Sequence, residues 1–226
     1  MKNIILTLLF TISSTLFTFA QNLKGVYIAK KNDVTHLILA TAHYITHTSY
    51  SKDGYENTQG GTYRLENNNL IVHCEFDDKS SESVARAHIF PIKIVENSIQ
   101  IDDLSFNKQI AIPQELDGLW RITGRKNKDI MQTIQRGDRK TIKILVDGYF
   151  QWIAINPAEK GFYGTGGGKY TFKNNQYQED ILFFSRDNNK VGVTLNFEGK
   201  IENQQWHHSG RSSKGDPIFE IWSREK

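Results

Sequence analysis

The chain carries an internal duplication, which limits its fold more than any other feature of the sequence. Four short matches occur in the same order in both halves: Leu23–Tyr27 with Leu116–Trp120, Gly60–Arg64 with Gly167–Thr171, Asn67-Asn68 with Asn174-Asn175, and Lys93-Ile94 with Lys200-Ile201. The last three pairs are all 107 residues apart. Each match is weak by itself, but their common order predicts two homologous domains.

The repeat sets the expected domain boundaries at residues 21–113 and 114–226, with Ile112–Glu115 as the joint. Pro113 lies in this joint, where it removes a backbone donor and suits a connection outside any strand. The opening matches are only 93 residues apart, so the second copy holds an insertion of about 14 residues. Its expected place is Arg125–Arg139, which has no counterpart in the first copy.

Met1–Ala20 has the features of a cleaved export signal. Lys2 gives a positive start, an uncharged apolar stretch follows, and Ala20 ends the segment with a small residue. The alternative is a membrane anchor, which the Ser and Thr residues of the stretch disfavour. No cysteine lies near the junction, so a lipid anchor is not expected. The sequence therefore predicts a secreted or periplasmic protein without a membrane span after cleavage behind Ala20.

Composition narrows the class of the remaining chain. A net charge of +3 is too small to predict a surface for nucleic acid. One cysteine excludes an internal disulfide framework and a cysteine-clustered metal site. The 38% hydrophobic content is that of a soluble globular protein.

The strand pattern is clearest in the second half. Short β-branched and aromatic runs alternate with turn-rich segments, which is typical of a sandwich or an up-and-down barrel. Thr141–Ile155 is interrupted by Asp147-Gly148, a hairpin signal. The other expected strands are Lys169–Phe172, Gln178–Phe184, Val191–Phe197, Lys200–His207 and Ile218–Trp222, with one turn expected at Glu198-Gly199.

Helical periodicity is confined to the insertion, where Lys128–Arg136 could form one or two turns with Ile130, Met131 and Ile134 facing inward. Such a segment would be a lid or plug over a barrel mouth. The alternative is a surface loop held by the same three apolar side chains.

Alternation in the first half predicts a hairpin of Ile71–Phe76 with Val84–Phe90. Pairing Val72 with Ile89 gives one apolar face and sets His73 across from His88 on a polar face. The ungapped repeat alignment disagrees, because it sets His88 against Leu195 at a core-like position. We follow the alternation and expect a one-residue slip in the alignment.

Gly118-Leu119-Trp120 opens the first strand of the second half, and Arg224 follows Trp222 at the end of its last. This pattern resembles that of the lipocalin and calycin families. In that pattern the arginine covers the tryptophan and closes the barrel, an arrangement that cation–π stacking favours. Gly166–Arg224 also resembles an uncharacterised lipocalin-like domain family of secreted bacterial proteins.

The resemblance implies two tandem small antiparallel up-and-down β-barrels, an all-β fold that could hold an apolar ligand. The first half matches only through the repeat. It has Tyr27 in place of the tryptophan and no arginine in its expected last strand, Ile99–Phe106. This favours a degenerate, structural first copy and leaves its closure open.

Aromatic residues concentrate in the second copy, where they are either the core of a filled barrel or the wall of a cavity. Trp206 and His208 share a strand face, as do Glu220 and Trp222. His208 and Glu220 either point inward as a polar anchor, or face water with Glu220 paired to an arginine. The predicted ligand-binding residues are Trp152, Tyr170, Phe183, Trp206, His208, Glu220 and Trp222.

Catalysis and metal binding have little support. Ser209 follows His208 directly, and neighbouring strand residues face opposite ways, so they form no nucleophile–base pair. Cys74, expected opposite Ala87, is interpreted as a buried thiol. His73, His88 and Glu75 could hold Zn²⁺, but their predicted face is that of a solvated surface. We expect no catalytic residues, no metal and no cofactor.

Three functions remain. The leading hypothesis is a carrier of a small apolar or amphipathic ligand in the second barrel. The second is a cell-envelope interaction module, an adaptor or inhibitor whose exposed loops recognise a protein partner. The third is an enzyme that uses Glu220 and His208 as acid and base, which nothing in their spacing requires.

Overall fold

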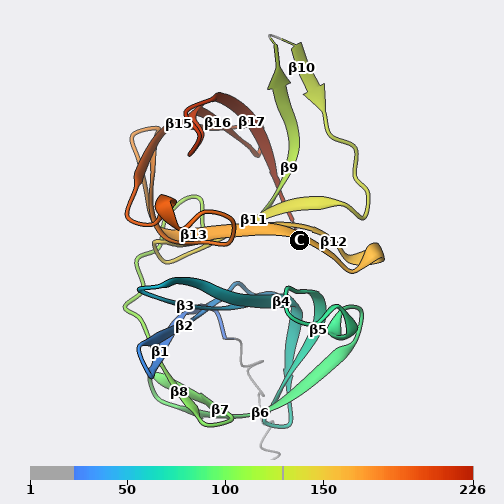
Figure 1. Ribbon diagram of the computed structural model, residues 1–226, viewed down its shortest axis with the longest axis vertical. Coiled ribbons are helices and arrows are strands. Elements are labelled where there is room, and N and C mark those ends of the chain that lie inside the picture. Colours follow the sequence, from blue (N-terminus) through green and yellow to red (C-terminus); the bar gives the residue numbers. More distant parts are fainter. Residues whose placement is uncertain (1–22, 129, 226) are drawn as a thin grey trace, which may run out of the picture.

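The computed structural model describes residues 23–128 and 130–225, so the predicted export signal lies outside the described residues. The described chain is all-β, with two closed eight-stranded antiparallel up-and-down barrels, one above the other in Figure 1. Three short 3₁₀ turns, Ser81–Ser83, Pro157–Glu159 and Asn188–Lys190, lie in the connections.

The first barrel closes through its terminal strands, where Tyr27 lies opposite Lys108. This settles the question that the missing arginine left open. Its strands are β1 (Gly25–Lys31), β2 (Val34–Ala40), β3 (Tyr44–Ser51), β4 (Gly54–Glu66), β5 (Asn69–Asp77), β6 (Ala87–Val95), β7 (Ser98–Ile101) and β8 (Leu104–Lys108).

The second barrel closes in the same way, with Arg224 opposite Trp120. Eight strands form the barrel, and β10 is appended to the edge of β9 as a hairpin. The strands are β9 (Gly118–Asn127), β10 (Ile130–Thr133), β11 (Lys140–Val146), β12 (Tyr149–Asn156), β13 (Gly161–Lys173), β14 (Gln176–Phe184), β15 (Thr194–Glu202), β16 (Gln205–Arg211) and β17 (Pro217–Arg224).

The repeated glycines have the same structural role in both barrels. A β-bulge lies between Gly60 and Gly61 in β4, and another between Gly167 and Gly168 in β13. A side chain at Gly61 or Gly168 would collide with the backbone of the neighbouring strand, so glycine is required at both. The two barrels therefore bend at equivalent points.

The barrel ends are closed by a cation over an aromatic ring, strongly in one copy and weakly in the other. The guanidinium carbon of Arg224 lies 4.3 Å from the centre of the Trp120 ring, and its nitrogens donate to the carbonyls of Glu115 and Asp117. In the first barrel Lys108 Nζ lies 5.7 Å from the centre of the Tyr27 ring. The first copy thus keeps the arrangement with a lysine and a tyrosine.

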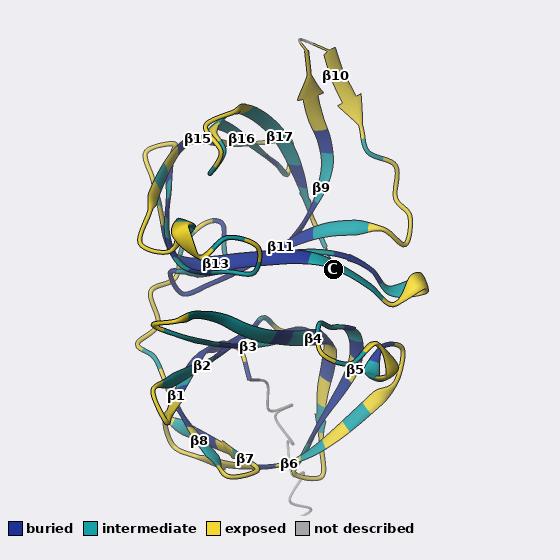
Figure 2. Cartoon of the chain, viewed as in Figure 1, coloured by how far each residue is buried: buried dark blue, intermediate teal, exposed yellow. Residues whose placement is uncertain are grey.

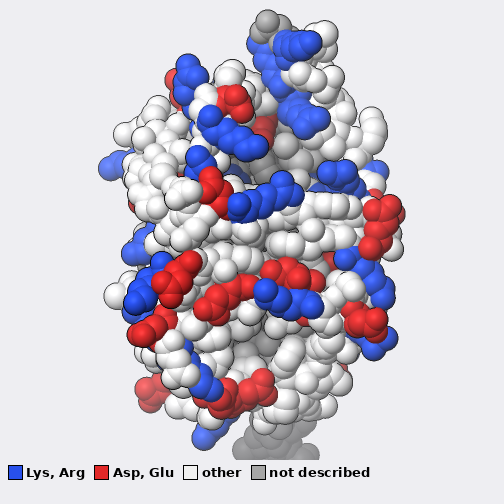
Figure 3. All heavy atoms as spheres, viewed as in Figure 1, with Lys and Arg blue, Asp and Glu red and all other residues white. Residues whose placement is uncertain are grey.

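The insertion is a β-hairpin, and the predicted helical turns are wrong. Strand β10 pairs with the outer half of β9, and the hairpin projects from the barrel (Figure 1). Ile130 and Met131 are 68% and 45% exposed and do not face inward. Figure 3 shows Lys and Arg side chains gathered on this hairpin.

One expected turn is also wrong. Strand β15 runs through Glu198 and Gly199, and the chain turns instead at Asn203-Gln204, which divides the expected strand Lys200–His207. Both turn residues have positive φ, the geometry of a tight hairpin. Gly199 has a packing role, since a Cβ there would lie 3.1 Å from Trp206 Nε1.

A shared apolar layer joins the two barrels. Side chains of β2 and β3 pack against those of β11 and β12, and these walls are buried on both faces (Figure 2). Polar contacts also join the barrels: Gln151 Nε2 donates to Thr58 Oγ1 at 3.0 Å, Lys140 Nζ to Glu75 Oε2 at 2.8 Å, and Asn188 Nδ2 to the carbonyl of Asp53 at 3.4 Å. The fully buried residues of the layer are Val26, Leu37, Leu39, Tyr44, Phe76, Ile142, Ile144, Val146, Ile153, Ile155 and Phe183.

Candidate functional site

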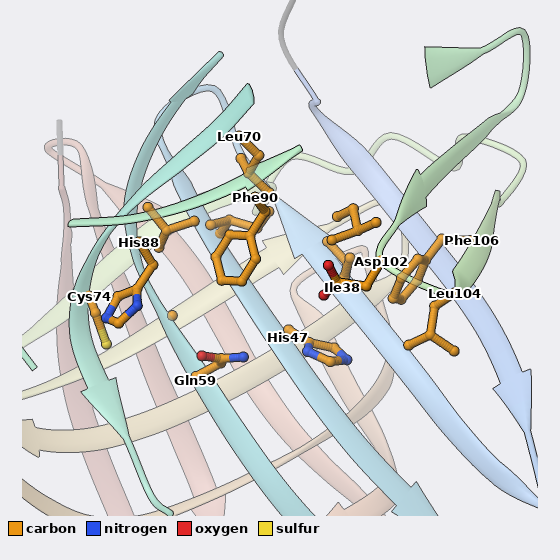
Figure 4. A pocket seen from close by; sticks show the side chains of 14 residues that line it. Ile38, His47, Gln59, Leu70, Cys74, His88, Phe90, Asp102, Leu104 and Phe106 are labelled. Atoms are coloured by element: carbon orange, nitrogen blue, oxygen red, sulfur yellow. The ribbon is translucent and has the colours of Figure 1, made fainter. Parts of the chain in front are cut away.

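The first barrel contains a cavity of about 140 Å³. Most of its wall is apolar, and four side chains that can hydrogen-bond, His47, Gln59, His88 and Asp102, enter the same space (Figure 4). The apolar wall residues include Ile38, Ile45, Leu70, Val72, Phe90, Ile101, Leu104 and Phe106. A mostly apolar space with a few polar groups is the usual composition of a small-molecule site.

The cavity arises from smaller side chains than those at equivalent positions of the second barrel. Ile38 lies opposite His47 just as Lys143 lies opposite Trp152. Leu70 lies opposite Leu65 just as Tyr177 lies opposite Phe172. At these positions the first barrel has aliphatic residues where the second has long or aromatic ones.

His47 is held in its neutral form. It is half-buried, and burial together with the neighbouring His36 lowers its pKa to about 4. The two rings stack with centres 5.4 Å apart, and His36 Nδ1 and His47 Nε2 share a hydrogen bond of 3.2 Å. Burial also lowers the pKa of His36. The wall around His47 is therefore polar but uncharged at neutral pH.

The predicted position of His88 is wrong. It lies opposite Val72, not His73, and lines the cavity, whereas His73 is exposed opposite Ala87. The ungapped repeat alignment, which sets His88 against Leu195, has the correct register. The cause is Ala85, whose φ of 66° advances the chain by one residue before β6 begins. Gly192 has a φ of 83° at the matching point of the second barrel.

Cys74 also lines the cavity, as a buried thiol whose pKa burial raises to about 11. Its sulfur donates to the carbonyl of Phe76 at 3.3 Å. The predicted partner Ala87 is wrong, since Ala87 lies opposite His73. A thiol with a raised pKa is a poor nucleophile, so Cys74 is a wall residue of the cavity.

Five of the seven predicted ligand residues do meet in the second barrel. Tyr170, Trp206, His208 and Trp222 are buried, and Glu220 is half-buried beside them. They pack on one another: the ring centres of Trp206 lie 6.0 Å from those of Trp222 and 5.0 Å from those of His208.

The other two predicted residues differ from these five. Trp152 is half-buried at the margin of the same core cluster and packs edge-on against Phe184, with ring centres 5.5 Å apart. Phe183 faces the shared layer, where its ring centre lies 5.3 Å from that of Tyr50 in the first barrel. Phe183 therefore contacts the other barrel rather than its own interior.

His208 and Glu220 form the inward pair that was one of the two sequence alternatives. His208 Nδ1 lies 3.1 Å from Glu220 Oε2, which also accepts from Trp222 Nε1 at 3.1 Å. Burial lowers the pKa of His208 and outweighs the neighbouring carboxylate. Burial works to raise the pKa of Glu220, but its contacts with His208, Lys143 and Trp222 lower it overall.

A buried ion pair in the same interior was missed. Lys143 Nζ donates to Glu179 Oε1 at 2.8 Å, and both side chains are about 5% exposed. Tyr177 donates to the same carboxylate oxygen. The sequence signal is a lysine at an inward position of one apolar strand and a glutamate at an inward position of another. The ammonium lies 5.1–5.7 Å from four ring centres, those of Phe150, Tyr177, Trp206 and Trp222.

The described residues contain no cluster of three or more side chains suited to a metal ion. The three side chains predicted to share one face, His73, His88 and Glu75, lie in different places. His73 is exposed and His88 lines the cavity. Glu75 Oε2 accepts from Tyr44 and Lys140 at the shared layer. The zinc alternative therefore loses its geometric basis.

Within the described residues, none of the helical segments has the length and apolar character needed to cross a bilayer. Comparison with models of known protein families finds no match to this chain, and neither does comparison with curated protein sequences. The two barrel interiors are therefore the features of the chain that bear on its function.

Proposed function

We propose that the protein is an exported lipocalin-like carrier that binds a small, mostly apolar ligand in its first barrel. The observation that carries the proposal is the cavity of about 140 Å³ with an apolar wall and a few polar side chains. A dry apolar cavity of about 150 Å³ can hold a benzene molecule, so the ligand is about the size of one ring or a short chain.

This places the ligand in the first barrel instead of the second, where the sequence predicts it. The residues predicted to bind the ligand in the second barrel contact each other, and Lys143 occupies the space among their rings. Large side chains that fill a small barrel give it stability. We therefore assign the second barrel a structural role.

The lipocalin-like assignment is supported by the covering of Trp120 by Arg224 at the barrel end. Placement outside the cytoplasm is supported by the sequence of Met1–Ala20. A carrier role without catalysis is supported by the raised pKa of Cys74 and by the packing of His208 and Glu220 inside a filled interior.

The test is non-denaturing mass spectrometry of the protein purified from its own host. We expect a small organic mass that denaturation releases. Val72→Phe, which adds a ring inside the cavity, should lose this mass while its circular dichroism stays that of the wild type. Ile94→Phe, at a position 38% exposed, is the matched control and should keep it. A bare chain mass in the wild type would contradict the carrier function.

The projecting hairpin favours a second function, that of an envelope interaction module. Ile130 and Met131 are exposed on a short edge strand, a surface that partner proteins commonly cover. Under this proposal, proteolysis within residues 125–139 slows in an envelope extract, and Ile130→Asn with Met131→Asn removes the protection. Equal cleavage with and without the extract would exclude it.

A further inference from the structure

The charges around the first-barrel cavity specify its ligand more closely. Of the fourteen residues that line it, Asp102 is the one with a formal charge, and no lysine or arginine is among them. Asp102 is exposed and lies in the turn between β7 and β8, so its carboxylate is at the mouth of the cavity and not in its interior. A buried anion without a cationic partner costs several kcal/mol. A carboxylate ligand would therefore lack a partner and would face the Asp102 carboxylate.

A lysine at this end of the barrel is already engaged in an ion pair. Lys31, at the end of β1, forms an ion pair with Asp103, the residue that follows Asp102 in the β7–β8 turn. Its charge is compensated by that carboxylate, so it supplies no free cation to a ligand at Asp102.

The polar groups of the wall differ in what they offer a ligand. His88 Nε2 lies 3.0 Å from the carbonyl of Ser83, which can only accept, so Nε2 carries a hydrogen and donates it there. The Cys74 thiol donates its hydrogen to Phe76. The side-chain amide of Gln59 offers both donors and an acceptor, whereas the Asp102 carboxylate can only accept. Asp102 is therefore the wall group that favours a ligand that donates.

The surrounding turns add negative charge. The four connections at this end of the first barrel and the strand residues that flank them hold seven carboxylates and four cations. The carboxylates are Asp33, Asp53, Asp77, Asp78, Glu82, Asp102 and Asp103, and the cations are Lys31, Lys52, Lys79 and Arg86. Overall, residues 23–113 hold 9 Lys and Arg against 11 Asp and Glu, whereas residues 114–226 hold 18 against 14. The first barrel is thus the acidic half of a basic protein, and its mouth attracts cations over about 10 Å at moderate salt.

We propose that the first-barrel cavity selects a small apolar amine, with its hydrocarbon part among Ile38, Leu70 and Val72 and its ammonium group at Asp102. The inference rests on the proposed carrier function and names the ligand class of that same site.

The experiment uses three probes of nearly equal size and different charge: benzylamine, benzyl alcohol and benzoate. Titration calorimetry of the mature protein at pH 7 and low salt should show benzylamine binding at least ten-fold more tightly than benzoate, with benzyl alcohol between them. Asp102→Asn should weaken benzylamine several-fold and leave benzyl alcohol unchanged. Asp216→Asn, in the β16–β17 connection of the other barrel, is the control and should change neither.

The outcomes separate the two proposals. Benzoate binding as tightly as benzylamine, or Asp102→Asn leaving benzylamine unaffected, would overturn the amine inference while the carrier function stood. Absence of binding by all three probes, together with a bare chain mass for the protein from its own host, would remove both.

Discussion

The two barrel interiors differ at matched positions of the same backbone plan. Where the second barrel has Tyr177, Glu179 and Lys143, the first has Leu70, Val72 and Ile38. The second interior is filled by rings around a hydrogen-bonded ion pair, whereas the first is aliphatic and leaves a cavity. The two barrels therefore keep the same strand register but differ in side-chain size. Large side chains fill the second interior, and smaller ones leave a cavity in the first.

The largest expected effect comes from exchanging the interior ion pair. Lys143→Ile leaves Glu179 as an unpaired buried carboxylate, so the free energy of unfolding should fall by about 3–5 kcal/mol in a urea titration. Lys143→Ile with Glu179→Val installs the first barrel's side chains and should recover at least half of that loss. Lys200→Ile, which removes an exposed ion pair with Glu202, should cost less than about 1 kcal/mol. A loss for Lys143→Ile no larger than that of Lys200→Ile would show that the buried pair does not hold this interior together.

The second prediction concerns acid stability of the first barrel. His47 has a folded pKa of about 4, below the unfolded value of 6.5, so the unfolded chain takes up the proton first. Its contribution is complete above pH 6.5 and is lost as the pH falls towards 4, by roughly 2 kcal/mol. His47→Gln should flatten the pH dependence of urea unfolding in this window.

The exposed His43 provides the control, because His43→Gln should keep the wild-type slope between pH 6.5 and 4. His208 has a lowered pKa as well, so His208→Gln tests whether the second interior shares this acid sensitivity. A wild-type slope in His47→Gln would contradict the neutral wall described for the cavity.

Removing the cation that covers the aromatic ring at each barrel end should lower the free energy of unfolding by a smaller amount, and by different amounts in the two barrels. Arg224→Ala removes the guanidinium over Trp120 and two hydrogen bonds, and should cost about 1.5 kcal/mol by thermal unfolding. Lys108→Ala removes a longer contact with Tyr27 and should cost about 0.5 kcal/mol. Equal costs would mean that the two closures are equivalent despite their geometry.

The last prediction concerns Ala85 and Gly192, the residues that set the β6 and β15 registers. Ala85 has a φ of 66°, which strains an L-residue, so Ala85→Gly should raise the free energy of unfolding by up to about 1 kcal/mol. Gly192→Ala should lower it by a similar amount, since no atom crowds that position and only the backbone angle matters. The two substitutions are controls for each other. If both changed the free energy of unfolding in the same direction, the positive φ shared by the two positions would not explain the effect.

The fold could be predicted because its strongest signals are local. Repeated glycines mark the bulges, and Asn174-Asn175 and Asp147-Gly148 have the positive φ values that such pairs favour in hairpins. The face of His88 could not be predicted from alternation, since an alanine gives no local sign of the left-handed conformation that shifts the register. The repeat alignment carried the correct register, and the matching residue of the second copy is Gly192. The turn expected at Glu198-Gly199 was wrong because glycine occurs both in turns and where side chains pack closely on a strand. Gly199 is of the second kind, since it packs closely against Trp206.

The candidate site was predicted less well, for a reason of size rather than pattern. Aromatic density marks where side chains are large, but a cavity forms where they are small. The first copy was therefore overlooked, although its Ile38 and Leu70 stand at positions where the second copy has Lys143 and Tyr177.

The apolar layer between the barrels has a consequence for how the protein reaches its native state. The first barrel is synthesised ahead of the second, yet its β2 and β3 wall is covered by strands of the second barrel, chiefly β11 and β12. Until those strands form, Leu37, Leu39 and Tyr44 belong to an exposed hydrophobic sheet, the kind of surface that aggregates or recruits a chaperone. The second barrel, which is made later, thus buries the apolar wall of the first. Chains that end before residue 156 would leave that wall exposed.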